Sequence, residues 1–462
     1  MSSTPMSSAG ILGEAGPSAE LTYARGMAAI GEDETAKQAY IAVLTRDPTH
    51  LAALTELGFL ARAGGHHAAA RTAYEQAVRC HPHHPGGHVS LANLLLEQGE
   101  PEAAARHYRT ALAADPACAA AHQGLAQILA EHDAIAAEAH AAQGFPGHAI
   151  ITRPYRGTGQ GISILLLVSA RGGNIPARHW ISDRQFEIHV LYAEYYDPAV
   201  PLPSHALVVN LIGDADLCER ALVAAEAVVA RSAARLINPP ARVRQTGRAA
   251  NARRLAGIEG VITPRILCVS RASLGSAGSL EYPVLLRAPG YHTGQHFHLA
   301  RDPAELAHAA RALPGKEYLL ISYLDARGAD GFYRKYRVMI VGGVIYPLHL
   351  AIGPHWLLHY YSSAMADEPS HRAEELRFLT AMPEVLGPRA MKALAGIAGA
   401  LGLDYCGVDF ALAPDGALLL FEANATMVAA DPGPDPRWDY RRPAIRNVIA
   451  AAANLLLRGT LR

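Results

Sequence analysis

Small and apolar residues recur along the first third of the chain with a period of 34 positions. The period is kept by alanine, tyrosine and proline, at Ala36, Ala70 and Ala104, at Tyr40, Tyr74 and Tyr108, and at Pro48, Pro82 and Pro116. Within each period the apolar residues return every three to four positions, which is typical of two amphipathic helices. The proline after each second helix cannot continue it and forces a turn. The pattern predicts an all-α solenoid of helix pairs over residues 20–145, closed by a shortened last unit.

These repeats resemble the tetratricopeptide repeat, in which small residues let two helices approach closely and a tyrosine fills the remaining gap. The resemblance implies that the solenoid recruits a peptide or a protein. Two alternatives stay open: packing against a neighbouring domain, and contact with a second subunit in a homodimer. Histidines cluster at the second turn, at His81, His83, His84 and His88. A solvated loop is favoured there over a metal site, because residues 81–88 include no cysteine or acidic partner.

After residue 145 the pattern changes to short apolar runs that alternate with helical segments. Residues 146–161 are rich in Gly and Pro and predict a linker. The continuous apolar run Ile162 to Ser169 predicts a strand buried on both faces. It ends in the loop Ala170 to Asn174, at the strand end where open α/β sheets bind ligands. Further strands are predicted at 186–192, 206–212 and 235–237, with a helix at 216–232, so residues 162–245 are expected to form an α/β domain.

Three polar side chains stand out in two apolar strands near the end of the chain. Asp409 lies in the first strand, Asp415-Gly416 reads as a hairpin turn, and Glu422 and Asn424 close the second strand. Residues two apart on a strand share a face, so Glu422 and Asn424 point the same way and the hairpin brings Asp409 beside them. Three oxygen-bearing side chains on one face predict a site for a hard cation such as Mg²⁺. The alternative is three polar strand ends that face water.

The order of segments between about 160 and 430 resembles the ATP-grasp enzymes of the glutathione-synthetase-like and RimK-like kind. The resemblance is carried by Val208-Val209-Asn210, Ile237-Asn238-Pro239-Pro240, Thr246 to Leu255, Gly260 to Arg265, Tyr282 to Arg287, Gly290 to His298, Glu317 to Leu324, Tyr336-Arg337-Val338 and the set Asp409, Glu422 and Asn424. It implies a pre-ATP-grasp α/β domain at 162–245, followed by an α+β ATP-grasp domain at 246–462 with a lid subdomain at about 256–315.

The resemblance also implies roles for individual residues. Adenine and ribose would be held at the hinge by Ile321, Tyr323, Leu324 and Asp325, with Asp330 as an alternative ribose partner. Phosphates would be held by Arg248 and Arg287, which stand where the family commonly has lysines, and by the backbone of Gly290 and Gly294 in the lid loop. Asp409, Glu422 and Asn424 would hold two Mg²⁺ ions, with Mn²⁺ as the alternative metal. The lid histidines His292, His296 and His298 either assist or lie on the lid surface.

The chemistry implied is ATP-dependent joining of a carboxylate to an amine through an acyl phosphate. Arg337 would orient the acyl phosphate, and Lys335, on the same strand face, is the second candidate. Two alternatives remain: an ATP-grasp kinase that stops at phosphoryl transfer, and a repeat scaffold with a non-catalytic nucleotide domain. The arginines at lysine positions favour the scaffold, whereas the complete Asp409, Glu422 and Asn424 set favours the ligase.

The sequence gives the least information about the residues that form the substrate pocket. The stretch Leu348 to Tyr361 holds His349, His355, Trp356 and His359, and forms either a substrate wall or an insertion packed on the core. The arginines Arg437, Arg441 and Arg442 follow a proline-rich loop and either bind an acid or, more simply, lie on the surface.

Length and composition constrain the number of domains, the class of partner and the cellular compartment. A chain of 462 residues is expected to form several domains. Its net charge of −1 gives no field that favours nucleic acid or an anionic membrane as a partner. We expect the protein to lie in a reducing cytoplasm. Its five cysteines are scattered and form no CxxC, and the sequence has no signal-peptide pattern and no apolar run long enough to cross a bilayer. The first 19 residues, rich in Ser, Gly and Pro, are expected to be disordered, and the Ala-, Gly- and Arg-rich composition is typical of bacteria.

Overall fold

The computed structural model describes residues 17–130, 133–274, 281–289, 296–360 and 363–460. Its contacts divide the chain into two compact units. The first comprises the chain up to Leu166 with residues 170–172 and 182–205, and the second comprises residues 167–169, 173–181 and everything from Ala206. The two predicted lid-loop residues Gly290 and Gly294 and the lid histidine His292 lie outside the described residues.

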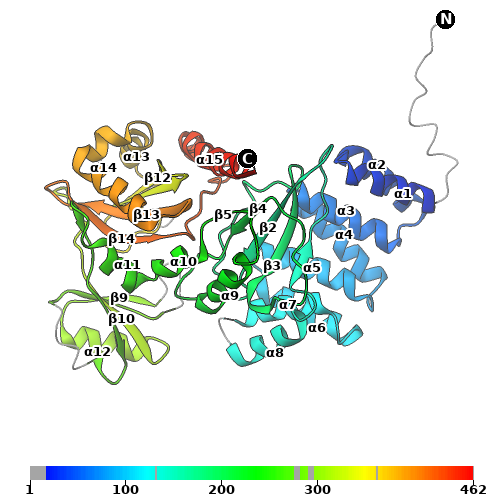
Figure 1. Ribbon diagram of the computed structural model, residues 1–462, viewed down its shortest axis with the longest axis horizontal. Helices are drawn as coiled ribbons and strands as arrows, with labels where there is room; N and C mark the ends of the chain where they lie inside the picture. The colour runs from blue at the N-terminus through cyan, green and yellow to red at the C-terminus, as the bar shows by residue number, and fades with distance from the viewer. Residues whose placement is uncertain (1–16, 131–132, 275–280, 290–295, 361–362, 461–462) are drawn as a thin grey trace, which may run out of the picture. The chain divides into compact units, whose positions relative to one another are not determined.

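The first unit begins with eight helices that follow one another as antiparallel pairs (Figure 1). They are α1 (Pro17–Ala29), α2 (Asp33–Arg46), α3 (Leu51–Ala63), α4 (His67–Cys80), α5 (Pro85–Glu97), α6 (Pro101–Ala114), α7 (Ala119–Leu129) and α8 (Ala134–Gly144). The periodic alanines and tyrosines are buried, which confirms the predicted solenoid. Close packing explains the small residues, because a Cβ at Gly58 would stand 2.5 Å from the ring of Tyr74.

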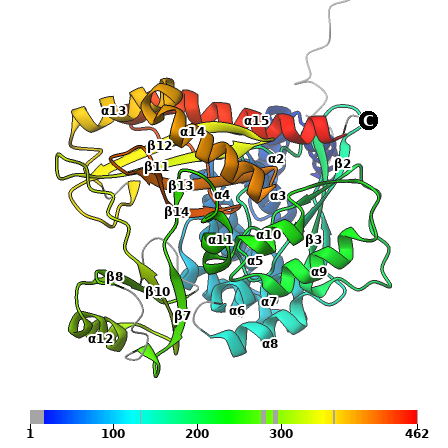
Figure 2. The ribbon, with the colours of Figure 1, turned by 60° about the vertical axis from the view of Figure 1, so that its left-hand side comes forward.

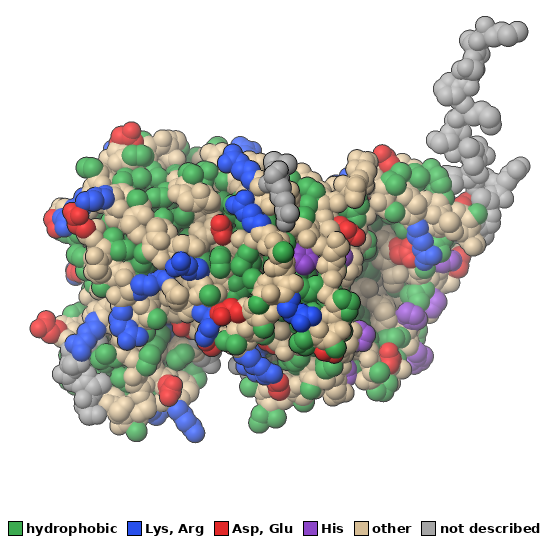
Figure 3. Space-filling view, in the orientation of Figure 1, with side chains coloured by type: hydrophobic (Ala, Val, Ile, Leu, Met, Phe, Trp, Pro, Cys, Tyr) green, Lys and Arg blue, Asp and Glu red, His purple; other side chains and the backbone are tan. Residues whose placement is uncertain are grey.

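The histidines of the repeats do not form the cluster that the sequence places together. His83 and His84 are exposed, whereas His88 is buried on α5 and its Nδ1 lies 3.1 Å from Nδ1 of His107 on α6. The arrangement recurs one repeat later, where His122 on α7 and His140 on α8 have their Nδ1 atoms 2.8 Å apart. Figure 3 shows histidine side chains on the visible face of the repeats. Among the described residues no group of three or more His, Cys, Asp or Glu is arranged to hold a metal.

The predicted linker contains a short strand. β1 (Ile150–Thr152) pairs antiparallel with β3 (Phe186–Tyr192), with Ile150 opposite Leu191. β2 (Ile162–Val168) and the short helix η2 (Ala193–Tyr195) complete this part of the chain. Three residues of the predicted linker therefore form a strand. Their extended backbone pairs with β3, although the flanking segment is irregular.

The second unit opens with a βαβ element, as predicted. β4 (Leu207–Asn210) and β5 (Arg235–Ile237) pair in parallel and are joined through α9 (Glu219–Val229). Asn238 follows β5 with a φ of 54° and is fully buried. Its side-chain Nδ2 donates to the carbonyl of Tyr405 at 2.8 Å, and its Oδ1 accepts from the amide of Tyr405 at 2.8 Å. The Asn-Pro-Pro segment thus ties the end of β5 to the strand that carries Asp409.

A four-stranded antiparallel sheet follows, with the strand order β7-β10-β8-β9. Its strands are β7 (Ile266–Ser270), β8 (Val284–Arg287), β9 (Phe297–Ala300) and β10 (Glu317–Ser322). The helix α12 (Pro303–Ala312) contacts β8 and β9 and closes a small core around Leu286 and Tyr318.

The last sheet has five strands in the order β12-β11-β13-β14-β6. They are β6 (Val261–Ile262), β11 (Tyr333–Val341), β12 (Val344–Gly353), β13 (Tyr405–Leu412) and β14 (Leu418–Asn424). One face is covered by α13 (Pro369–Thr380), α14 (Met382–Leu401) and α15 (Arg442–Thr460) (Figure 2). The helix α11 (Arg248–Leu255), which follows α10 (Pro240–Val243) and η3 (Arg244–Thr246), contacts β14 and β7, and η6 (Pro436–Arg441) precedes α15.

Helical repeats followed by a mixed α/β region with several sheets is the order that the sequence predicts, and the fold class is confirmed at this level. The finer division into a pre-ATP-grasp domain at 162–245 and an ATP-grasp domain at 246–462 stays a prediction. Within the described ranges no helix combines the length and apolar character that a membrane span needs.

Candidate functional site

A cavity of about 640 Å³ lies in the second unit, between the four-stranded and the five-stranded sheet. Its walls come from β7, β8, β9 and β10 on one side and from β11, β13 and β14 on the other, with α11 and the loops after β4 and β12 at its ends. One part of the lining is apolar, at Pro264, Ile266, Leu285, Ile321, Leu324 and Leu420. The volume is that of an ordinary small-molecule site.

The structure brings most of the predicted site residues together around this cavity. The lining includes Arg248, Arg287, Ile321, Tyr323, Leu324, Lys335, Arg337, Asp409, Glu422 and Asn424. Asp325 is not part of the lining and pairs with Arg327 at 3.1 Å. Asp330, the alternative ribose partner, is instead bound by Arg334, whose Nη2 lies 2.8 Å from its Oδ2.

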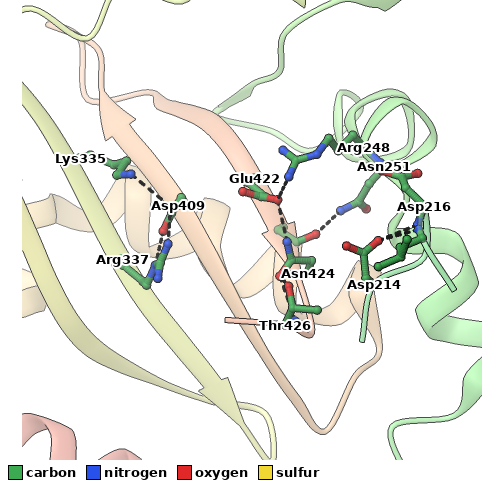
Figure 4. Close-up of polar contacts among 12 residues, drawn as sticks. Asp214, Asp216, Arg248, Asn251, Lys335, Arg337, Asp409, Glu422, Asn424 and Thr426 are labelled. Carbon is green, nitrogen blue, oxygen red and sulfur yellow. Dashed lines mark hydrogen bonds and ion pairs between the residues drawn. The ribbon is translucent and has the colours of Figure 1, made fainter. Parts of the chain in front are cut away.

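Asp409 and Arg337, which both line the cavity, form an ion pair. They are direct partners in the register of β13 with β11, and Arg337 donates to both carboxylate oxygens at 2.5 and 2.7 Å (Figure 4). Lys335, two residues away on the same strand face, lies 3.7 Å from the same carboxylate. Burial opposes ionisation of Asp409, but the charges of Arg337 and Lys335 outweigh it and hold the pKa of the carboxyl well below its usual range.

Glu422 lies directly opposite Asp409, as the hairpin pattern predicts. Its Oε1 is 2.7 Å from Nη2 of Arg248 and accepts a hydrogen bond from Nδ2 of Asn424 at 2.8 Å. The β-turn at Gly416, with a φ of 79°, and an irregularity in the register after Asp409 set this pairing. Helix α11 is anchored beside β14, because Nδ2 of Asn251 donates to the carbonyl of Ala423 at 2.6 Å.

The donor set of Asp409, Glu422 and Asn424 fits a hard divalent cation in its chemistry. Two carboxylates and one amide stand on neighbouring strands, and all three line the cavity. The amide oxygen of Asn424 accepts from the backbone amide and the hydroxyl of Thr426, each at 3.0 Å. That oxygen would have to turn toward Glu422 to join a metal, whereas the carboxylate of Glu422 points toward Arg248 (Figure 4).

Arg287 is the most deeply buried cation of the lining. It is 8% exposed on β8, and burial together with the nearby charge of Arg248 lowers its pKa to about 10. Its guanidinium lies over the ring of Phe297, 5.4 Å from the centroid. Arg248, Arg287, Lys335 and Arg337 thus place four positive charges around one cavity, an arrangement suited to a polyanion.

Sequence reasoning missed the loop after β4, which contributes two carboxylates. Asp214 and Asp216 both line the cavity. Asp216 accepts a hydrogen bond from the backbone amide of Arg248 at 3.1 Å, and burial raises its pKa. Gly213 packs against Thr426 so closely that a Cβ would stand 2.8 Å from its Cγ2. The signal was present in the sequence, since Gly213-Asp214-Ala215-Asp216 follows a buried strand at its carboxyl end.

The stretch after β12 lines the cavity rather than packing only on the core. Trp356, Leu357, Leu358 and His359 all belong to the lining. Burial, and then the charges of Lys335 and Arg337, lower the pKa of His359. His349 is instead buried on β12, and His355 is exposed.

The three arginines near the C-terminal helix do not line the cavity. Arg437 pairs with Asp435 at 2.6 Å, and Arg442 pairs with Asp431 at 2.7 Å, both at the surface. Arg441 departs from both sequence-based alternatives, because it is buried, 4% exposed, over the ring of Tyr360. The buried carboxylate of Glu375, 3.4 Å from its Nε, gives it a counter-charge.

Comparison with known proteins identifies the N-terminal repeats. Two models of the tetratricopeptide repeat match residues 31–85 and 61–128, so the repeats predicted from the 34-residue period are confirmed over this range. A search of curated proteins gives no match.

Solved structures similar to parts of the chain include a RimK domain ATP-grasp protein from Sphaerobacter thermophilus, with 19% identity, a TM-score of 0.39, and coverage of 64% of this chain and 99% of that chain. A crystal structure of MamA has 20% identity and a TM-score of 0.26, over 28% of this chain and 71% of that chain. YrrB, a tetratricopeptide-repeat protein described as having an unusual peptide-binding site, has 20% identity and a TM-score of 0.26, over 28% of this chain and 69% of that chain.

Proposed function

We propose that the chain is an ATP-dependent carboxylate–amine ligase of the ATP-grasp kind, whose tetratricopeptide repeats recruit a peptide or protein substrate. The proposal is supported mainly by the charged residues that line the cavity. Asp409 and Glu422 face each other across two strands, and Arg248, Arg287, Lys335 and Arg337 line the same cavity. Paired acids amid several cations are the residue types needed to bind a nucleoside triphosphate with its metal.

The layout of the cavity supports a nucleotide with its base at one end and its phosphates at the other. The apolar lining around Ile321 and Leu324 offers a flat partner for adenine, and extended backbone at the end of β10 offers hydrogen-bonding groups. The cationic lining begins at Arg287 on the neighbouring strand β8. A site formed between a four-stranded and a five-stranded sheet also agrees with the resemblance drawn from the sequence.

The carboxylates are the proposed ligands of the metal ion. Asp409, Glu422 and Asn424 would hold Mg²⁺, which when bound neutralises charge on the transferred phosphoryl group. Arg337 and Arg248, which neutralise Asp409 and Glu422 in this structure, would then be available to phosphate oxygens. Lys335 and Arg287 add charge at the same place, and all four cations act by binding and orienting rather than by forming a covalent bond.

The proposed reaction has two steps. A substrate carboxylate oxygen attacks the terminal phosphorus of ATP, the bond from that phosphorus to the bridging oxygen breaks, and ADP leaves with the electron pair. The amine nitrogen then attacks the carbonyl carbon of the acyl phosphate, phosphate leaves, and the amine proton passes to solvent. The chain's residues hold the two reacting groups in line and keep their charges balanced.

A second candidate is favoured by the pairing of the acids. Asp409 and Glu422 are already bound by Arg337 and Arg248, and so the cavity is electrostatically satisfied without a ligand. A repeat scaffold that binds a partner and carries a non-catalytic nucleotide domain would have such a site. Turnover separates the two candidates, since a scaffold would bind without releasing phosphate.

The test is calorimetric titration of Mg·ATP into the full chain, with Glu422→Ala as the site variant and Glu259→Ala as the control. Glu259 is a surface glutamate whose side chain is 80% exposed and pairs with Lys392. We expect micromolar binding by the wild type and the control, and at least a hundredfold weaker binding by Glu422→Ala. No binding by the folded wild type would contradict the proposal and leave the repeats as the functional part.

A further inference from the structure

The end of the cavity beyond the cationic lining has a different character, and it is formed by four apolar side chains. We call Phe297, Trp356, Leu357 and Leu358 the apolar wall; all four line the cavity. Phe297 and Trp356 touch edge to face, with their ring centroids 5.3 Å apart. Phe297, Trp356 and Leu357 are only partly buried, so the wall presents apolar surface to the cavity. Such surface is stabilised when a ligand covers it.

Position separates the apolar wall from the adenine end. The strand order β10-β8-β9 places Phe297, on β9, two strands away from the hinge residues at the end of β10. Two strand spacings are about 10 Å. Trp356, on the loop after β12 of the other sheet, touches Phe297. Phe297 is the register partner of Arg287, a proposed phosphate ligand, so the wall begins where the phosphates would end.

The other end of the apolar wall adjoins the reacting groups. His359, next to Leu358 in the chain, lies close enough to Lys335, Arg337 and Arg287 for their charges to affect its imidazole. The apolar wall therefore adjoins the cations that would hold the transferred phosphoryl group. A substrate whose carboxylate or amine reacts at Arg337 would lay its next group against Trp356.

The chemistry of the apolar wall decides which group that is. Its four side chains carry no charge. Of the two histidines in the same loop stretch, His355 is exposed, and His359 has its pKa lowered and so stays neutral at pH 7. An acidic or basic substrate side chain would lose its hydration there. The guanidinium of Arg287 lies over the ring of Phe297, and in the proposed complex its charge would be held by the phosphates rather than by a substrate side chain. An aliphatic or aromatic side chain would be stabilised by contact with Trp356 and Leu357.

We propose that the apolar wall is the specificity site for the peptide substrate, and that it selects an aliphatic or aromatic side chain next to the reacting carboxylate or amine. The inference rests on the proposed ligase function and adds the substrate class to it. A peptide supplies both reactive groups, so the site can be probed without knowing which of them reacts.

The first experiment measures phosphate release from Mg·ATP in the presence of the dipeptides Leu-Phe, Glu-Glu, Lys-Lys and Gly-Gly. We expect Leu-Phe to stimulate release at least about tenfold more than Glu-Glu or Lys-Lys, the discrimination that a well-formed apolar pocket provides. Trp356→Ala should raise the KM for Leu-Phe about tenfold more than it changes the KM for Gly-Gly or the Kd for Mg·ATP. Leu376→Ala, an exposed leucine on α13, is the matched control and should behave as the wild type.

The second experiment uses Trp356 itself as the reporter and does not need the variant to fold. The chain has three tryptophans, and Trp180 and Trp438 are 5% and 7% exposed, whereas Trp356 is only partly buried at the cavity. With a non-hydrolysable ATP analogue bound, Leu-Phe should change the intrinsic fluorescence at concentrations about tenfold below those needed for Glu-Glu.

The outcomes distinguish this inference from the proposed function. Mg·ATP binding with equal or stronger responses to Glu-Glu or Lys-Lys would overturn the inference and leave the ligase proposal standing. Mg·ATP binding with no response to Leu-Phe, or a Trp356→Ala variant that keeps the wild-type preference, would do the same. Absence of Mg·ATP binding in the folded wild type would overturn both.

Discussion

Arg337 and Asp409 face each other across β11 and β13, and the guanidinium of Arg337 donates to both carboxylate oxygens of Asp409 at 2.5 and 2.7 Å. The side chain of Asp409 is 5% exposed and that of Arg337 is 24% exposed. The pair therefore acts at the boundary between the sheet core and the cavity. It keeps Asp409 ionised. A metal ion can compete with Arg337 for the carboxylate, and a phosphate can compete with Asp409 for the guanidinium.

Removing the carboxylate of this pair should cost stability as well as function. Asp409→Ala leaves Arg337 without its principal counter-charge inside the sheet, and we expect the free energy of unfolding to fall by about 3 kcal/mol, the cost typical of breaking a buried ion pair. Urea unfolding followed by circular dichroism measures the change. Glu259→Ala removes a carboxylate that is fully at the surface and serves as the control. Equal stability of Asp409→Ala and the control would show that the pair contributes nothing.

Arg287 should contribute to nucleotide affinity through its charge. Its pKa of about 10 leaves it protonated at pH 7, and its burial on β8 lets it act in a poorly hydrated place. Arg287→Met keeps most of the side-chain volume and removes the charge, and we expect the Kd for Mg·ATP to rise about tenfold to a hundredfold.

The control for this prediction is Arg253→Met, an exposed arginine on α11 outside the cavity lining. Titration calorimetry gives both affinities. A Kd for Arg287→Met that matches the control would remove Arg287 from the phosphate site.

The two histidine pairs should make the repeats sensitive to acid. Burial, and then the neighbouring histidine, lower the pKa of His107 and of His140. A histidine whose pKa is lowered on folding stabilises the fold fully above its unfolded value of about 6.5, and this stabilisation is lost as the pH falls through its folded pKa. Hydrogen exchange in α5 to α8 should therefore speed up below about pH 6.5, after correction for the intrinsic rate.

Replacing His107 and His140 by Asn should flatten this pH response, because the titrating rings that face His88 and His122 are then absent. Exchange that stays equally slow at pH 5 and pH 7.5 in the wild type would exclude the effect.

Tyr74 should stabilise the repeats without contributing to nucleotide binding. Its ring is 2% exposed and packs directly on Gly58. Tyr74→Ala should lower the free energy of unfolding of the repeats by about 3–5 kcal/mol, the range for deleting a buried aromatic side chain. Tyr74→Phe keeps the ring and is the matched control. Mg·ATP affinity should be the same in both variants, and a large loss of affinity in Tyr74→Ala would mean that the repeats and the cavity are coupled.

The sequence predicts well those features that a local pattern determines. The alanine and tyrosine period gives the repeats, because helix packing demands small and large residues at fixed intervals. The hairpin at Gly416 gives the pairing of Asp409 with Glu422, because strand alternation and a short turn leave few registers. The partners of these acids were harder to see, since Arg248 reaches Glu422 from a helix more than 150 residues earlier in the chain.

Other features depend on tertiary contacts that no local pattern reveals. Asp214 and Asp216 follow a buried strand, which indicates a ligand-binding loop, but the contact of Asp216 with the first residue of α11 depends on the fold. The histidine pairs join residues on different helices, so the run of histidines in the loop at 81–84 does not indicate the pairing of His107 and His140. The sequence does not decide whether Trp356 lines a cavity, because an apolar loop residue packs equally well on a core or on a cavity.

The most direct test of the proposed chemistry is transfer of an oxygen label. Dipeptides whose carboxylates carry ¹⁸O are incubated with the full chain, Mg·ATP and unlabelled water, and the released phosphate is examined by mass spectrometry. The account predicts one ¹⁸O atom in each phosphate formed with a reactive peptide, because the carboxylate oxygen leaves with the phosphoryl group, and no labelled phosphate from Glu422→Ala. Unlabelled phosphate from a turning-over wild-type enzyme would contradict the acyl-phosphate route.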